Sequence, residues 1–210
     1  DERIEVKEFH EELNETKHPI LKPLKQVAVK DKIALLKRAD KAMREYDDCI
    51  KTVQNRYSDE VQDVTIYNTD GKMVKDHRER TRLYLMAVAQ EGELRQDAGR
   101  NPGAHQGFEF YDDMNIEELA RETCESAITM LHAKDCPSGE MTVVIDNGFG
   151  GVIFHEACGH SLEATSVAKG NSVFCGKLGE KIASDCVTAV DDGTIVNGWG
   201  SGNVDDEGNP

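Results

Sequence analysis

Residues 83–89 constrain the fold of this chain most, because every one of them is apolar or aromatic. Successive side chains of a β-strand point to opposite faces of the sheet. Leu83, Leu85 and Ala87 would therefore lie on one face, and Tyr84 and Met86 on the other. A strand that is apolar on both faces has to be covered on both. We expect this strand at the centre of its sheet.

The segments on either side of this strand indicate an antiparallel meander. The hydrophobic period is close to two between residues 49 and 100, which is typical of strands. Residues 68–71 read Asn-Thr-Asp-Gly, a composition that favours a hairpin loop because Gly and Asn tolerate positive φ. Residues 90–93 reverse the chain again. The pattern predicts three to five antiparallel strands.

Two amphipathic helices are predicted to flank this sheet. Residues 31–47 carry apolar side chains at helical spacing, with Asp31 as the expected N-cap. A second helix is expected to begin at Asn115, because Glu118 three residues later completes a capping-box pattern. The expected fold class is therefore α/β, of the α+β type, with an antiparallel meander and flanking helices.

The chain changes character near residue 140. Residues 1–139 contain the predicted meander and helices, and form a mixed α/β N-terminal region. Residues 141–145 read Met-Thr-Val-Val-Ile, which predicts a short buried strand. A glycine-rich turn follows at residues 148–151, and the chain then enters the segment that carries chemistry. We expect residues 140–210 to begin a second region.

His155, Glu156 and His160 form the pattern H-E-x-x-x-H. Imidazole nitrogen is a good zinc ligand, and a catalytic zinc site usually has three protein ligands and one open position. Zinc lowers the pKa of water, and a glutamate beside the first histidine can take the proton and pass it to a leaving amine. The pattern predicts a zinc site with Glu156 as general base.

The spacing of the two histidines makes a demand on the backbone. The common zinc motif places its histidines four residues apart, whereas His155 and His160 are five apart. On a regular α-helix such positions lie roughly 140° apart, so the rings would diverge. A π-type turn closes a ring between residues i and i+5 and would bring them together. Gly159 is suited to such a bend. We therefore expect a helix over residues 151–162 with a widened or broken turn.

The stretch from Gly148 to His160 resembles the TldD/PmbA family of metallopeptidases, whose active subunits carry a glycine-rich lead-in followed by H-E-A-x-G-H. The resemblance is strong over residues 140–210 and compatible over residues 1–139. It implies zinc ligation by His155 and His160 and general-base catalysis by Glu156. It also implies a third zinc ligand, a cysteine in the far C-terminal part of the proteins of this family. On this basis the chain is expected to be a fragment, truncated at the C-terminus, that is not active by itself.

The residues leave two questions about this site open. Cys158 lies inside the motif and is one candidate for the third ligand, with Cys175 and Cys186 as others. Four carboxylates could orient a histidine ring from the outer shell. These are Glu163, Asp185, Asp191 and Asp192, and in an acidic protein each could equally be a solvated surface group.

Composition narrows the possible partners. The net charge of −15 repels phosphate backbones, so direct binding of nucleic acid is not expected. The apolar stretches are too short for a membrane span, and six scattered cysteines favour a reduced, cytoplasmic protein. The resemblance implies short or unfolded peptides as substrates. It also implies a PmbA-like partner subunit, or a second copy of the chain, in a heterodimer or homodimer.

Two other functions remain as alternatives. The chain could be a non-catalytic interaction subunit of a TldD/PmbA-type heterodimer, although such a subunit does not need His155, Glu156 and His160. It could also be a regulator associated with nucleic acid, because the family has been linked by name to the modulation of gyrase. Zinc analysis separates the enzyme from the first alternative, and salt-dependent DNA binding separates it from the second.

Overall fold

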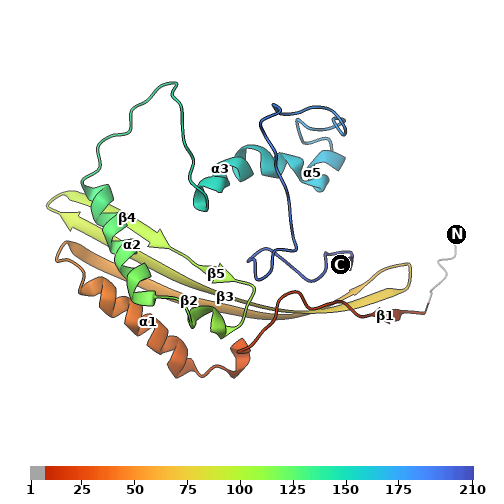
Figure 1. The fold of residues 1–210 in the computed structure, drawn as a ribbon, viewed down its shortest axis with the longest axis horizontal. Coiled ribbons are helices and arrows are strands. Elements are labelled where there is room, and N and C mark those ends of the chain that lie inside the picture. The colour runs from red at the N-terminus through yellow and green to blue at the C-terminus, as the bar shows by residue number, and fades with distance from the viewer. Residues whose placement is uncertain (1–7) are drawn as a thin grey trace. The chain divides into compact units, whose positions relative to one another are not determined.

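The computed structural model describes residues 8–210 of the chain. It contains two compact units (Figure 1). The first consists of the residues up to Lys134 together with Asp192–Pro210, and the second is Asp135–Asp191. The boundary predicted between residues 139 and 140 stays a prediction.

A mixed sheet with β3 at its centre forms the first unit. The antiparallel partner β2 lies along one side of β3, while β4 and β5 pair antiparallel with its other side and β1 pairs parallel there. The strands are β1 (His10–Glu12), β2 (Ile50–Tyr67), β3 (Lys72–Glu91), β4 (Leu94–Arg100) and β5 (Gly103–Ala104). The predicted meander is confirmed in β2, β3 and β4. The expected central position of residues 83–89 is also confirmed.

Two helices, α1 (Val29–Arg44) and α2 (Ile116–Leu131), pack against this sheet and against each other (Figure 1). Leu83 and Leu85 of β3 are buried in the same cluster as Met43 of α1 and Ala120 of α2. Full burial of one such leucine side chain contributes roughly 2 kcal/mol. The α+β class is thereby confirmed. Short 3₁₀ helices, η1 (Leu24–Gln26) and η2 (Phe108–Tyr111), lie in the connections.

The predicted N-cap of α2 is confirmed, and the predicted N-cap of α1 is not. Asn115 caps α2, because its side-chain oxygen accepts a hydrogen bond from the backbone N–H of Glu118 at 3.1 Å. The prediction that Asp31 caps the first helix is wrong. Helix α1 begins at Val29 after Ala28, and Asp31 lies in its first turn. A negative charge in the first turn also stabilises the helix, because it interacts favourably with the helix dipole.

Polar contacts hold residues 192–210 on the sheet. The side chain of Asn203 donates a hydrogen bond to the buried carboxylate of Asp76 at 2.7 Å, and Arg78 binds the same carboxylate at 2.6 Å. The guanidinium of Arg82 stacks over the ring of Trp199, 3.7 Å from its centre. These long-range pairs order a segment that has few apolar residues.

Two buried histidines also link this segment to the sheet unit. The rings of His18 and His105 are stacked with their centres 4.2 Å apart. Nδ1 of His18 accepts a hydrogen bond from the backbone N–H of Asn197, and Nδ1–H of His105 donates to the carbonyl of Ser201. Burial is the main cause that lowers the pKa of both imidazoles. The two neutral rings therefore hold residues 192–210 against the rest of the sheet unit through these hydrogen bonds.

A short helical run forms the part of the second unit that has regular secondary structure. It contains η3 (Phe149–Gly151), α3 (Val152–Phe154), the π-helix η4 (His155–Gly159), α4 (His160–Leu162) and α5 (Ala164–Ala168). No helix within residues 8–210 has the length and apolar character needed to cross a bilayer.

The strand predicted over residues 141–145 is wrong. This segment has no regular secondary structure, and Val143 and Val144 are exposed. A strand needs a hydrogen-bonded neighbour. Within the described part of the chain, the sheet pairs only β1 to β5, and none of these five strands includes residues 141–145.

Candidate metal centre

The backbone widens between the two histidines of the motif. Residues His155–Gly159 form a π-helix, and the N–H of His160 donates a hydrogen bond to the carbonyl of His155. This bond spans five residues, one more than in an α-helix. Regular α-helical turns precede it at Val152–Phe154 and follow it at His160–Leu162. The widened turn predicted from the histidine spacing is confirmed.

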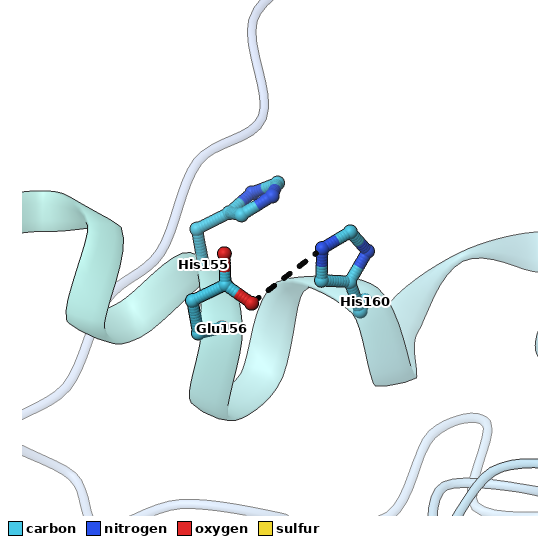
Figure 2. A group of neighbouring side chains, drawn as sticks. All are labelled: His155, Glu156 and His160. Atoms are coloured by element: carbon cyan, nitrogen blue, oxygen red, sulfur yellow. Dashed lines mark ion pairs between the residues drawn. The ribbon is translucent and has the colours of Figure 1, made fainter.

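The widened turn brings His155, Glu156 and His160 to one side of the helix, as Figure 2 shows. The ring centres of the two histidines are 4.4 Å apart, and their planes are inclined by 65°. Each of the three residues offers one ligand atom, and these atoms all lie within 4.8 Å of one another. A tetrahedral zinc ion holds two nitrogen ligands about 3.4 Å apart. The three ligand atoms are therefore near enough to share one metal ion if the rings turn toward it.

Gly159 allows the ring of His155 to lie across the turn. A Cβ atom at position 159 would be 3.3 Å from Nδ1 of His155 and 3.6 Å from its Cγ. The backbone of Gly159 is helical, with φ −55° and ψ −54°, so the requirement is for space and not for an unusual conformation. A side chain here would press on the first histidine of the cluster.

Carboxylates face both nitrogens of the His160 ring. Nδ1 lies 2.7 Å from Oε1 of Glu163, and Nε2 lies 3.8 Å from Oε2 of Glu156. The hydrogen bond to Glu163 is the main cause that raises the pKa of His160, and the charges of Glu163 and Glu156 add to it. Glu163 was one of the four carboxylates that the sequence left open. The signal for it is its position three residues after His160, where side chains of a helix are neighbours.

Two other carboxylates named from the sequence have partners of their own. Asp185 forms an ion pair with Lys181 at 2.6 Å, and Asp192 accepts hydrogen bonds from the backbone and side chain of Thr194. Within the described residues the metal-ligating cluster consists of two imidazoles and one carboxylate, without a thiol. Cys158 lies in the same turn but stays outside this group.

An apolar hollow of about 670 Å³ lies beside Glu156. It is lined by Gly150, Val152, Ile153 and Ala157 together with Glu156 itself. The lining is almost entirely apolar, so Glu156 contributes the apolar part of its side chain to this hollow.

Comparison with protein families gives two matches that follow one another along the chain. The model described as the PmbA/TldA metallopeptidase central domain matches residues 22–131. The model described as the PmbA/TldA metallopeptidase C-terminal domain matches residues 138–210, which include the cluster at His155, Glu156 and His160.

Several curated proteins are similar to the chain. The metalloprotease TldD homolog of Haemophilus influenzae is 34% identical over 199 residues, which cover 92% of the chain and 41% of that protein. A metalloprotease of Methanothermobacter thermautotrophicus is 43% identical over 141 residues, which cover 67% of the chain and 31% of that protein. The chain thus spans well under half the length of these relatives.

A solved structure shares the fold. A crystal structure from Bacteroides thetaiotaomicron, of a proposed modulator of DNA gyrase, superimposes with a TM-score of 0.75 at 24% sequence identity. The superposition covers 90% of the chain and 44% of that protein. At this identity the likeness establishes the fold, while function has to be argued from the site.

Proposed function

The chain belongs to the PmbA/TldD family of metallopeptidases, and from this premise we propose that it provides the metal-binding and general-base residues of a zinc-dependent peptidase. The observation that carries the proposal is the π-turn that gathers His155, Glu156 and His160 within ligand distance. A non-catalytic subunit of a heterodimer has no need of this arrangement.

His155 and His160 would hold the metal ion through one ring nitrogen each. When bound, zinc would supply the Lewis acidity that makes water reactive near neutral pH. Glu156 would accept the proton of that water and return it to the leaving amine of the cleaved peptide bond. Its carboxylate oxygen, 3.8 Å from Nε2 of His160, lies close enough to the ligand atoms for this role.

Two imidazoles do not complete a catalytic zinc site, which usually takes three protein ligands. Membership of the family implies a cysteine as the third ligand, and we propose that it lies outside residues 1–210. No thiol joins the cluster among the described residues. The 210-residue chain by itself would then hold zinc weakly and be inactive.

Peptides are the proposed substrates, in short or unfolded form. The hollow beside Glu156 supports this proposal, because an apolar side chain next to the cleaved bond would occupy it. A PmbA-like subunit or a second copy is the proposed partner. The net charge of −15 argues against direct contact with DNA, whatever the role of the Bacteroides protein.

The test combines zinc content with turnover of an unfolded peptide, measured on the intact protein with its partner present. Glu156→Gln should keep zinc and lose a factor of about 10²–10⁴ in rate, because an amide cannot accept the proton. His155→Ala should lose zinc and activity together. Glu180→Gln makes the same chemical change at an exposed glutamate outside the motif and should change neither.

Glu156→Gln tests proton transfer, and His155→Ala tests metal binding. If Glu156→Gln cleaves the peptide at the wild-type rate, the cluster is a structural metal site and the peptidase mechanism is wrong. If wild-type protein holds no zinc and cleaves no peptide, the non-catalytic alternative is correct.

A further inference from the structure

The two nitrogens of His160 have different partners, and this difference assigns a role to Glu163. Nδ1 lies at hydrogen-bonding distance, 2.7 Å, from the carboxylate of Glu163. Nε2 faces the other way, toward Glu156 at 3.8 Å. The ring of His160 is thus held between one carboxylate inside the ligand cluster and one outside it.

The hydrogen bond to Glu163 fixes which nitrogen carries the proton. A carboxylate can only accept, so the hydrogen of a neutral ring has to be on Nδ1. The lone pair is then on Nε2, which points toward Glu156 and the rest of the cluster. A metal ion binds the nitrogen that lacks the proton, and a partner on the other nitrogen sets the tautomer and the orientation of the ring.

The backbone leaves the side chain of Glu163 free for this contact. Glu163 stands between α4 and α5 with φ −59° and ψ 128°, so the helix breaks at this residue. Its carbonyl accepts a hydrogen bond from the N–H of Val167 at 3.0 Å, but its side chain makes no capping bond at the start of α5. The side chain reaches back to His160, one turn earlier.

We propose that Glu163 is a positioning residue that presents Nε2 of His160 to the metal. The proposal rests on the proposed zinc site and goes beyond it, because it assigns a residue that lies outside the H-E-x-x-x-H motif. Glu163 would not touch the substrate or the metal. It would act through His160, by holding the ring in one tautomer and one orientation and by making the ligand more basic.

The primary measurement is zinc affinity, obtained by competition with a chromogenic chelator on the intact protein. Glu163→Ala should weaken zinc binding by roughly 10- to 100-fold, the usual cost of losing such a partner. Glu163→Gln keeps an oxygen acceptor for Nδ1–H and should lose less. Asp185→Asn is the matched control, because it neutralises an exposed carboxylate that pairs with Lys181, and it should bind zinc as the wild type does.

A second measurement reads the tautomer directly. Nitrogen-15 spectra of labelled histidine in the zinc-free protein, at a pH where the ring is neutral, should show His160 with its hydrogen on Nδ1. In Glu163→Ala the hydrogen should move largely to Nε2. A purely structural role of Glu163 would change the stability of the helix break without changing this ratio.

Each outcome decides a different question. Unchanged zinc affinity in Glu163→Ala, with wild-type protein binding zinc normally, overturns the inference and leaves the zinc site standing. Complete loss of zinc, as expected for His160→Ala, would make Glu163 a direct ligand and also overturn the positioning role. Failure of the wild type to bind zinc refutes the proposed function and this inference together. If Glu163→Ala does not fold, Glu163→Ser decides, because its side chain is too short to reach Nδ1 of His160: a loss of affinity supports the role, and wild-type affinity refutes it.

Discussion

Replacing Gly159 with alanine separates the stability of the metal-binding turn from its ability to bind metal. The backbone at Gly159 is helical, and alanine is favoured over glycine in a helix by about 1 kcal/mol. The protein should therefore be as stable as the wild type or slightly more stable. The new methyl group, however, would be only 3.3 Å from Nδ1 of His155, which is closer than the 3.5–4.0 Å optimum of a nonbonded contact.

The ring of His155 has to rotate to relieve this contact. The contact has to lengthen by only a few tenths of an ångström. Even a full rotation of about 30° away from a preferred rotamer costs only roughly 0.5–1.5 kcal/mol, so the loss of zinc affinity should stay within about 2- to 10-fold. Gly151→Ala is the matched control. It lies at the start of the same helical run, its backbone is also helical, and a Cβ atom there meets nothing within 4 Å.

The assay is zinc competition together with thermal unfolding of the zinc-free protein. We expect Gly159→Ala to bind zinc more weakly than Gly151→Ala while its unfolding temperature is maintained. Wild-type affinity in Gly159→Ala would refute the steric reasoning. Equal losses in both variants would show that the run of glycines matters for another reason.

Three further predictions concern the sheet unit. Leu83→Ala should lower the free energy of unfolding by about 2–5 kcal/mol in denaturant titrations, because Leu83 is fully buried, and a loss below 1 kcal/mol would contradict its central place. Asp63 raises the pKa of His77 above 6.5 through a hydrogen bond. The ion pair of these two residues therefore stabilises the fold fully below pH 6.5, and this stabilisation is lost as the pH rises through the folded-state pKa of His77. Asp63→Asn should therefore destabilise more at about pH 6 than at about pH 8, and an equal loss at both would refute this. Burial lowers the pKa of His18 and His105 below 6.5, so the folded protein binds fewer protons and stability falls as the pH drops below that value. His18→Gln should reduce this loss of stability at acidic pH, and an unchanged pH dependence of stability would contradict the role given to His18.

Local patterns in the sequence were sufficient for much of this fold and for the widened turn of the candidate site. Residues 83–89 are apolar on both faces, and they do lie in the central strand. The face with Leu83 and Leu85 is buried against the helices, while Tyr84 and Met86 on the other face are only half-buried. Asn115 was predictable as a cap because capping depends on residues three apart. The five-residue spacing of His155 and His160 required a widened turn for metal binding, and the structure contains it.

The features that sequence reasoning missed depend on residues far apart in the chain. The stack of His18 on His105 and the hydrogen bond from Asn203 to Asp76 leave no periodic signal, because each joins segments that are distant in sequence. The segment 141–145 has the composition of a strand, but composition does not specify a partner strand. Glu163 could be named as a candidate, but only the 2.7 Å contact with His160 distinguishes it from the other carboxylates.

The central claim is that His155 and His160 hold one zinc ion through the π-turn, and X-ray absorption at the zinc edge tests it most directly. The spectrum of the zinc-loaded intact protein should show two imidazole ligands and one thiolate, with zinc–nitrogen distances of about 2.0–2.1 Å and a zinc–sulfur distance of about 2.3 Å. His155→Ala, treated in the same way, should retain too little zinc to give a protein-bound spectrum. A wild-type spectrum without imidazole scattering, or the same spectrum in His155→Ala, would contradict the account.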